Sequence, residues 1–102
     1  MKYTVNTKQR LYLADNKFVI MLYRKLSIHV YRQSKLIAID YEDENVFKKT
    51  FSARTYNAIK KDVNCLLLAA SCELLMNKYN DDVVRIIKNN HEYIQKIFRD
   101  LM

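Results

Sequence analysis

Glycine and proline are both absent from this chain of 102 residues. At average usage a chain of this length contains about seven glycines and five prolines. P-loops, dinucleotide-binding fingerprints and nucleophile elbows need glycine, because the backbone must approach a phosphate or turn sharply there. The sequence therefore excludes these three kinds of site. Asparagine and aspartate are the best substitutes for glycine in a tight turn, and Asp15 and Asn16 lie between two predicted strands.

Size and hydropathy limit the class of protein. A chain of this length forms one domain, and its apolar fraction of 50% is enough for a modest core. The longest apolar run, around residues 65–71, is about ten residues, whereas a membrane-spanning helix needs roughly 18–20. Lys2 is not followed by an apolar segment, so we expect no signal peptide. These features predict a soluble domain of the reducing cytoplasm that does not bind membranes.

The first half of the chain favours β-strands. Apolar, β-branched and aromatic residues dominate or alternate with polar ones in residues 10–13, 17–24, 26–32 and 35–41. Residues 14–16 and 33–34 have the composition of turns, and residues 46–51 are a candidate for a last short strand. We predict an antiparallel sheet of three or four strands within residues 9–51. The alternative is one helix over residues 17–32, with an apolar face made by Phe18, Leu22, Leu26 and Val30.

The second half has helical periodicity. After Ser52, a candidate N-cap, apolar residues follow at helical spacing: Tyr56, Ile59, Val63, Leu66, Leu67, Ala70 and Leu74. Residues 66–70 are apolar on nearly every side, which places them at the centre of the core. The polar stretch 77–82 ends this helix, and Asn80 or Asp81 caps a second one, with Asp81 and Asp82 favourably placed near its N-terminal dipole. The buried stripe of the second helix contains Val83, Ile87, Ile94, Phe98 and Leu101.

The expected fold is therefore α+β. A small antiparallel sheet packs on two C-terminal helices, residues 53–78 and 81–101. The chain is one domain with a β-rich basic part, residues 1–51, and a helical hairpin, residues 52–102. We find no internal repeat and no low-complexity linker between the two parts.

Two cysteines lie in the first predicted helix. Cys65 and Cys72 are seven residues apart, about 10 Å along a helix axis, which is too far for a disulfide between them. Neither has another Cys or His at metal-ligand spacing. We predict that both are reduced, mostly buried side chains, and that the protein holds no metal and no cofactor.

Basic residues are concentrated in the first half. Residues 1–41 carry eight Lys and Arg against two Asp, whereas residues 42–102 carry ten against nine acidic residues. Tyrosines and a histidine lie among these cations, and single-strand nucleic-acid binders combine cations for phosphates with rings for bases. The sequence therefore predicts a site for single-stranded DNA or RNA made by Arg10, Tyr12, Tyr23, Arg24, Lys25, His29, Tyr31 and Arg32. The alternative is an ordinary solvated sheet face.

Catalytic chemistry has little support in the sequence. Asp40, Glu42, Asp43 and Glu44 form an acidic group, but a solvated turn explains it without a metal. His29 and His91 lie in different predicted elements, and each is expected to be a surface residue. We predict that the protein is not an enzyme.

A protein-binding role is the second functional hypothesis. The predicted C-terminal helix has apolar residues beyond its buried stripe, which would suit a homodimer or another protein partner: Val84, Ile86, Tyr93 and Ile97. The richness in Lys, Asn, Ile and Tyr is also typical of small phage and viral proteins, which often inhibit or adapt host factors. Either a basic sheet or an apolar helix surface would serve such a role.

Overall fold

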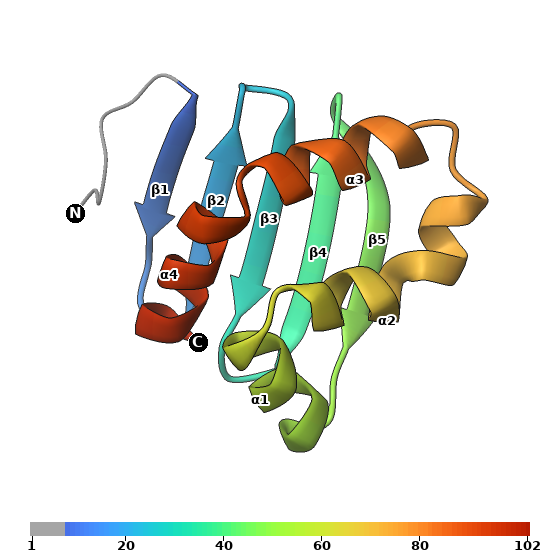
Figure 1. Cartoon of the computed structure of the whole chain (residues 1–102). Coiled ribbons are helices and arrows are strands. Elements are labelled where there is room, and N and C mark those ends of the chain that lie inside the picture. The colour runs from blue at the N-terminus through green and yellow to red at the C-terminus, as the bar shows by residue number, and fades with distance from the viewer. Residues whose placement is uncertain (1–7) are drawn as a thin grey trace. The chain divides into compact units, whose positions relative to one another are not determined.

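The computed structural model describes residues 8–102, so Lys2 lies outside the described residues. The chain forms two compact units, Met1–Thr50 and Phe51–Met102. Within residues 8–102, the first unit contains five strands and the second contains four helices (Figure 1). The α+β class is confirmed. The predicted numbers of three or four strands and two helices are both too low.

The first unit is an antiparallel meander. Its strands pair in chain order and are β1 (Gln9–Leu13), β2 (Lys17–Leu22), β3 (Leu26–Tyr31), β4 (Leu36–Tyr41) and β5 (Glu44–Thr50). Residues 17–32 are thus two strands and a turn, and the alternative of one helix there is wrong. The reason is the period-two pattern: in β2, Phe18, Ile20 and Leu22 are buried and the residues between them are half-buried. Such a pattern buries one face only when the segment is extended.

The turns show how a chain without glycine makes a meander. The β1–β2 turn closes at Ala14 as predicted, because the amide of Ala14 donates to the carbonyl of Lys17 at 2.9 Å. The β2–β3 turn places Tyr23 and Arg24 in left-handed backbone, with φ of 56° and 58°. Left-handed backbone costs a residue other than glycine roughly 1–2 kcal/mol. The β4–β5 turn likewise uses two left-handed residues, Glu42 and Asp43.

The second unit contains four short helices. They are α1 (Ala53–Lys61), α2 (Asn64–Leu75), α3 (Asn80–Asn89) and α4 (His91–Leu101). Ser52 is the N-cap of α1 as predicted, since its hydroxyl accepts from the amide of Thr55 at 3.2 Å. The predicted helix 53–78 is therefore broken between α1 and α2, and the predicted helix 81–101 is broken at Asn90.

A buried side chain from α4 accounts for the first break. Asp62 ends α1 in extended backbone, and its carboxylate accepts from the amide of Asn64 at 2.9 Å. The amide of Val63 donates to Oε1 of Gln95 at 2.9 Å, and Nε2 of Gln95 donates to the carbonyl of Lys60 at 2.9 Å. Gln95 thus provides partners for two backbone groups that the helix break leaves open.

The second break is made by an asparagine. Nδ2 of Asn90 donates to the carbonyl of Ile86 at 2.7 Å, and this carbonyl also accepts from the Asn90 amide at 3.1 Å, so the asparagine adds a local side-chain bond at the end of α3. At the other end of α3, the N-cap is Tyr79, with no side-chain capping bond, so the predicted cap at Asn80 or Asp81 is wrong. Asp81 and Asp82 do lie in the first turn, as predicted.

Each unit has its own set of buried apolar residues. One face of the sheet buries Leu11, Phe18, Ile20, Leu22, Leu26, Ile28, Val30, Ile37, Ile39, Tyr41 and Phe47. The helices bury Tyr56, Ile59, Val63, Leu66, Ala70, Leu74, Val83, Ile86, Ile87, Ile94, Ile97 and Phe98. Among the described residues, no helix combines the length and the apolar character needed to cross a membrane.

Helix α2 differs from its predicted role. Leu66 and Ala70 are buried, but Leu68 between them is 74% exposed, so the segment is not surrounded by core on every side. Both cysteines lie in α2 as free thiols. Cys65 is half-buried and Cys72 is exposed, which corrects the prediction that both are mostly buried. One side of α2 faces the core and the other faces solvent.

Candidate functional site

The second face of the sheet carries three rows of side chains that cross the strands. Because side chains alternate along a strand, the register between strands fixes these rows. The middle row contains Tyr12, Val19, His29, Ala38 and Lys48; the second contains Lys17, Tyr31, Leu36 and Thr50; the third contains Arg10, Met21, Ser27, Asp40 and Asn45. We call this surface the open face.

A hollow lies in the open face over the small side chain of Ala38. Its volume is about 340 Å³, and it is lined by Lys17, His29, Tyr31, Leu36, Ala38, Asp40, Asn45 and Lys48. Alanine at the centre of longer neighbours leaves the space that the hollow occupies. Two ammonium groups, one from β2 and one from β5, therefore border one concave surface, which we call the Ala38 hollow.

Lys17 and Tyr31 form a pair on the wall of this hollow. The ammonium of Lys17 lies 4.7 Å from the centroid of the Tyr31 ring, within the range of a cation–π contact. The two residues face each other directly in the β2–β3 register. The pair places a positive charge beside an aromatic ring, on a half-buried part of the sheet.

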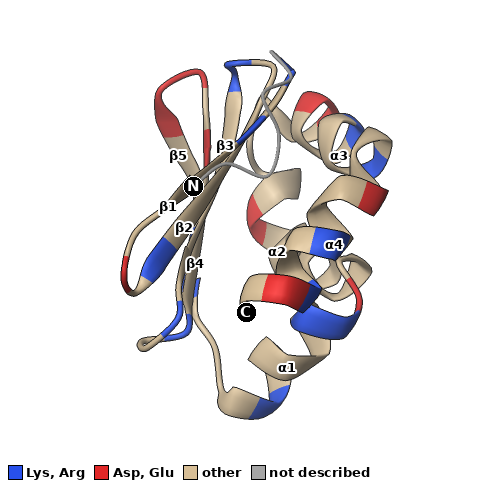
Figure 2. Cartoon of the chain, turned by 90° about the vertical axis from the view of Figure 1, so that its left-hand side faces the viewer, with Lys and Arg blue, Asp and Glu red and all other residues tan. Residues whose placement is uncertain are grey.

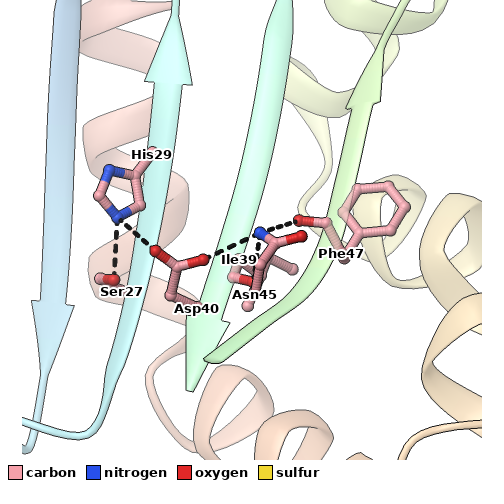
Figure 3. Close-up of polar contacts among 6 residues, drawn as sticks. All are labelled: Ser27, His29, Ile39, Asp40, Asn45 and Phe47. Carbon is pink, nitrogen blue, oxygen red and sulfur yellow. Dashed lines mark hydrogen bonds and ion pairs between the residues drawn. The ribbon is translucent and has the colours of Figure 1, made fainter. Parts of the chain in front are cut away.

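His29 is held by polar neighbours at the floor of the hollow (Figure 3). Its Nε2 lies 3.0 Å from the hydroxyl of Ser27 and 3.4 Å from the carboxylate of Asp40. Asp40 in turn accepts from Nδ2 of Asn45 at 2.9 Å. Burial lowers the pKa of His29 below its ordinary value of 6.5, the Asp40 carboxylate opposes this effect, and Lys17 adds to it. The imidazole is therefore neutral at pH 7.

These three residues are not arranged as a catalytic triad. In a triad, the hydroxyl bonds one ring nitrogen, which takes its proton, and the carboxylate bonds the other nitrogen and orients the ring. Here the oxygens of Ser27 and Asp40 approach the same nitrogen of His29 (Figure 3). Ser27 is also only 8% exposed. The geometry at His29 therefore differs from that of a catalytic triad.

The structure brings together only some of the predicted site residues. His29 and Tyr31 line the Ala38 hollow. Arg10 and Tyr12 lie on the open face of the edge strand β1, where Tyr12 is 45% exposed.

The β2–β3 turn carries Tyr23, Arg24 and Lys25 at the other end of the sheet. The carbonyl of Lys25 accepts from the amide of Glu42 at 3.0 Å, so these cations lie beside the acidic β4–β5 turn (Figure 2). Opposite charges at this end reduce its attraction for phosphate. The Ala38 hollow has two lysines, Lys17 and Lys48, against one acidic lining residue, Asp40.

Arg32 makes contacts within the protein that the sequence did not predict. Its Nη2 donates to the carbonyls of Ala14 and Asp15, both at 3.1 Å. Its guanidinium also lies 5.7 Å from the centroid of the Phe18 ring. Arg32 thus ties the end of β3 to the β1–β2 turn through Nη2.

Sequence reasoning missed four members of the site: Lys17, Asp40, Asn45 and Lys48. Lys17 could have been predicted, because the alternation in residues 17–22 already places it on the face of the sheet that Phe18 does not share. Asp40 was predicted to belong to a solvated acidic turn, yet it faces the hollow while Glu42 and Asp43 form the turn. Across residues 8–102, no group of three or more His, Cys, Asp or Glu side chains is placed to hold a metal ion.

The residues predicted for a protein interface are mostly covered. Ile97 has no exposed surface and Ile86 is 8% exposed, while Val84 and Tyr93 are half-buried. Burial also raises the pKa of Tyr93. The exposed apolar side chains of the helical unit lie elsewhere, at Leu68, Leu75 and Met76.

Comparison with known proteins adds no assignment to this geometry. The chain matches no family model, no curated protein and no solved structure. Its function is therefore argued from the sites themselves.

Proposed function

We propose that the protein is a non-enzymatic binding protein whose open face binds single-stranded nucleic acid. The observation that carries this proposal is the Ala38 hollow, where Lys17 and Lys48 border one surface with Tyr31 and His29. Phosphates need cations, and unpaired bases need flat apolar rings. The open face offers both within three adjacent rows.

The order of side chains in the middle row of the open face suits an extended single strand of nucleic acid. Tyr12, His29 and Lys48 share this row on β1, β3 and β5. Neighbouring strands are about 4.8 Å apart, so Tyr12 and His29 are separated by roughly 10 Å. A nucleic-acid strand crossing the sheet would thus meet rings and cations in turn. The unstacked bases of a single strand permit this contact, whereas those of a duplex do not.

Binding should depend on salt in a defined way. Three cations of the open face, Arg10, Lys17 and Lys48, are placed to meet phosphates. Each contact on a single strand contributes about −0.7 to the slope of log affinity against log salt, so we expect a slope of about −2. Fluorescence anisotropy of a labelled 20-mer at several salt concentrations measures this slope. The absence of binding at low salt would contradict the proposal and favour an acidic protein partner for the open face.

Replacement of Tyr31 by alanine should weaken binding more than the loss of a similar tyrosine elsewhere. Stacking on one base contributes on the order of 1–3 kcal/mol, so Tyr31→Ala is expected to lower affinity roughly 5- to 150-fold. Tyr31→Phe keeps the ring and should bind nearly as well as the wild type. Tyr79→Ala is the matched control, because the ammonium of Lys78 lies 5.0 Å from the Tyr79 ring in the helical unit. Equal effects of the two alanine variants would mean that the protein attracts nucleic acid only by its net charge.

Affinity should also rise as the pH falls. His29 is neutral at pH 7 because its pKa is lowered, and acidification through that pKa adds a positive charge to the hollow. A bound phosphate favours the charged form, so the wild type should gain affinity as the pH falls below the ordinary histidine pKa of 6.5. His29→Gln should lose this gain. Anisotropy at fixed ionic strength checks it, and equal pH profiles of the two proteins would argue against phosphate beside His29.

The same pKa shift sets a lower limit for the pH of that experiment. The folded protein binds the His29 proton less readily than the unfolded chain, because burial lowers the folded-state pKa. The stability contribution of neutral His29 is therefore complete above pH 6.5 and is lost as the pH falls through the folded-state pKa.

We also place the activity in the reducing cytoplasm, since the exposed Cys72 is a free thiol.

A further inference from the structure

Helix α2 presents an uncharged apolar face to solvent. Its core side consists of Leu66, Ala70 and Leu74, which are buried. Its outer side consists of Cys65, Leu68, Ala69, Cys72, Leu75 and Met76, and three of these are strongly exposed: Leu68 at 74%, Leu75 at 71% and Met76 at 89%. The helix has one charged residue, Glu73. Apart from Asn64, Ser71 and Glu73, the exposed surface of α2 is apolar, and apolar helix surface is normally buried against another element.

A groove continues this face toward α3. Its volume is about 440 Å³, and its lining is mostly apolar: Asn64, Leu67, Leu68, Ser71, Leu74, Leu75, Asn80, Val84 and Lys88. Asn64 begins α2 and Lys88 is near the end of α3, whereas Leu75 ends α2 and Asn80 begins α3. The two helices run in opposite directions (Figure 1), so the end of α3 with Lys88 lies toward the start of α2 and Asn80 toward its end.

We propose that this surface is the interface of a homodimer, in which α2 packs antiparallel on α2 of a second copy. The first argument is the spacing of the outer residues. Cys65, Leu68, Cys72 and Leu75 follow the three-four spacing of a heptad seam, which packs a helix against another with the same repeat. In an antiparallel pair centred on residue 70, Cys65 lies level with Leu75 of the second copy, and Leu68 lies level with Cys72. Each layer then combines one small and one large side chain.

The helix dipoles provide the second argument. Helix α2 has no acidic residue in its first turn and no basic residue in its last turn. The negative end of its dipole thus lacks a compensating charge on the helix itself, whereas the Asp62 carboxylate bonds the Asn64 amide at the positive end. An antiparallel copy places the negative end of one α2 beside the positive end of the other. A parallel copy would place like ends together.

Charge complementarity on α3 is the third argument. An antiparallel α2 pair centred on residue 70 has a two-fold axis there, and this axis also relates α3 of one copy to α3 of the other. Asp81 is in the first turn of α3 and Lys88 is in its last turn, and both are exposed. Because Lys88 lies near the start of α2 and Asn80 near its end, an axis at the middle of α2 brings Lys88 opposite Asp81 of the second copy. Arg85 is already paired with Asp82 at 2.7 Å. The surface is therefore complementary to itself.

Sedimentation velocity over a range of concentrations tests the dimer. Helices of 12 and 10 residues are about 18 and 15 Å long, so the interface is at the small end of the specific range. We expect dimers at high micromolar concentration and monomers at low micromolar concentration. Leu68→Glu should give monomer throughout without unfolding, since the side chain is exposed. Leu13→Glu, at a residue that is 37% exposed in the sheet, is the matched control and should still dimerise.

A charge swap distinguishes a second copy from any other occupant of the groove. Lys88→Asp should weaken dimerisation about tenfold, because it places an aspartate opposite Asp81 of the second copy. The double variant Asp81→Lys with Lys88→Asp should restore it. Failure of the double variant to recover, with its helix content intact by circular dichroism, would overturn the proposed pairing. A wild type that is monomeric at high micromolar concentration would overturn the dimer itself.

Disulfide trapping tests the orientation of the helices. Residues 65 and 75 of one chain are about 15 Å apart along α2, too far for a disulfide within the chain. In a Cys72→Ser background, Leu75→Cys should allow Cys65 to cross-link with residue 75 of the second copy on mild oxidation. Cys72→Ser alone should remain uncross-linked on a non-reducing gel. Cross-linking of Cys72→Ser alone would instead indicate parallel helices and contradict the antiparallel arrangement.

Discussion

Replacing Lys17 and Lys48 together by glutamate is expected to lower the affinity for a single-stranded 20-mer about a hundredfold at low salt. These two cations border the Ala38 hollow from β2 and β5. Reversing the charge of both side chains removes two of the three expected phosphate contacts and adds electrostatic repulsion of phosphate at the same place. The slope of log affinity against log salt should fall from about −2 to about −0.7. Fluorescence anisotropy with the same 20-mer measures both changes.

The matched control changes the net charge by the same amount in the helical unit. Lys61 and Lys96 are exposed on α1 and α4, and their joint replacement by glutamate should lower affinity only by a few-fold. If both double variants lose affinity equally, the total charge of +7 is responsible and the open face has no special role. If neither loses affinity, the phosphate contacts lie elsewhere.

Gln95→Leu is expected to lower the free energy of unfolding by about 2–4 kcal/mol. Gln95 is 6% exposed, and it provides the acceptor for the amide of Val63 and the donor for the carbonyl of Lys60. Leucine has a similar size but offers neither, so two backbone groups at the α1–α2 junction lose their partners. The melting temperature should fall by roughly 10–30 °C for a chain of this size.

Glu92→Leu is the control for this experiment. Glu92 is exposed on the same helix, and its replacement should change the free energy of unfolding by less than about 0.5 kcal/mol. Urea unfolding followed by circular dichroism measures both variants. A Gln95→Leu variant as stable as Glu92→Leu would show that the junction between α1 and α2 does not depend on Gln95.

The sheet could be predicted from the sequence because its signals are local. Residues 26–31 alternate between apolar and polar side chains, and the Asp and Asn of residues 14–16 mark a turn. The fifth strand was only a candidate, since Lys48 and Lys49 make its apolar pattern short. The helix breaks could not be predicted, because Val63 depends on Gln95, which lies 32 residues further along the chain.

Only the part of the site that depends on local sequence patterns could be predicted. His29 and Tyr31 lie in one alternating strand, so their shared face follows from parity alone. Lys48 joins them only through the pairing of Ala38 with Lys48, and the register shifts between Ile39 and Asp40 in that strand pair. The bonds of Arg32 to the β1–β2 turn could not be predicted, because their acceptors lie 17 and 18 positions away in the sequence.

Chemical-shift mapping is the most direct test of the proposed function. The nitrogen-15 labelled protein is titrated with a single-stranded 20-mer at low salt, and the amide shifts are assigned to residues. We expect the largest changes in the strands around the Ala38 hollow, at His29, Tyr31, Ala38 and Lys48, with smaller changes at Arg10 and Tyr12. Changes confined to α1–α4, or no changes at saturating nucleic acid, would contradict binding on the open face.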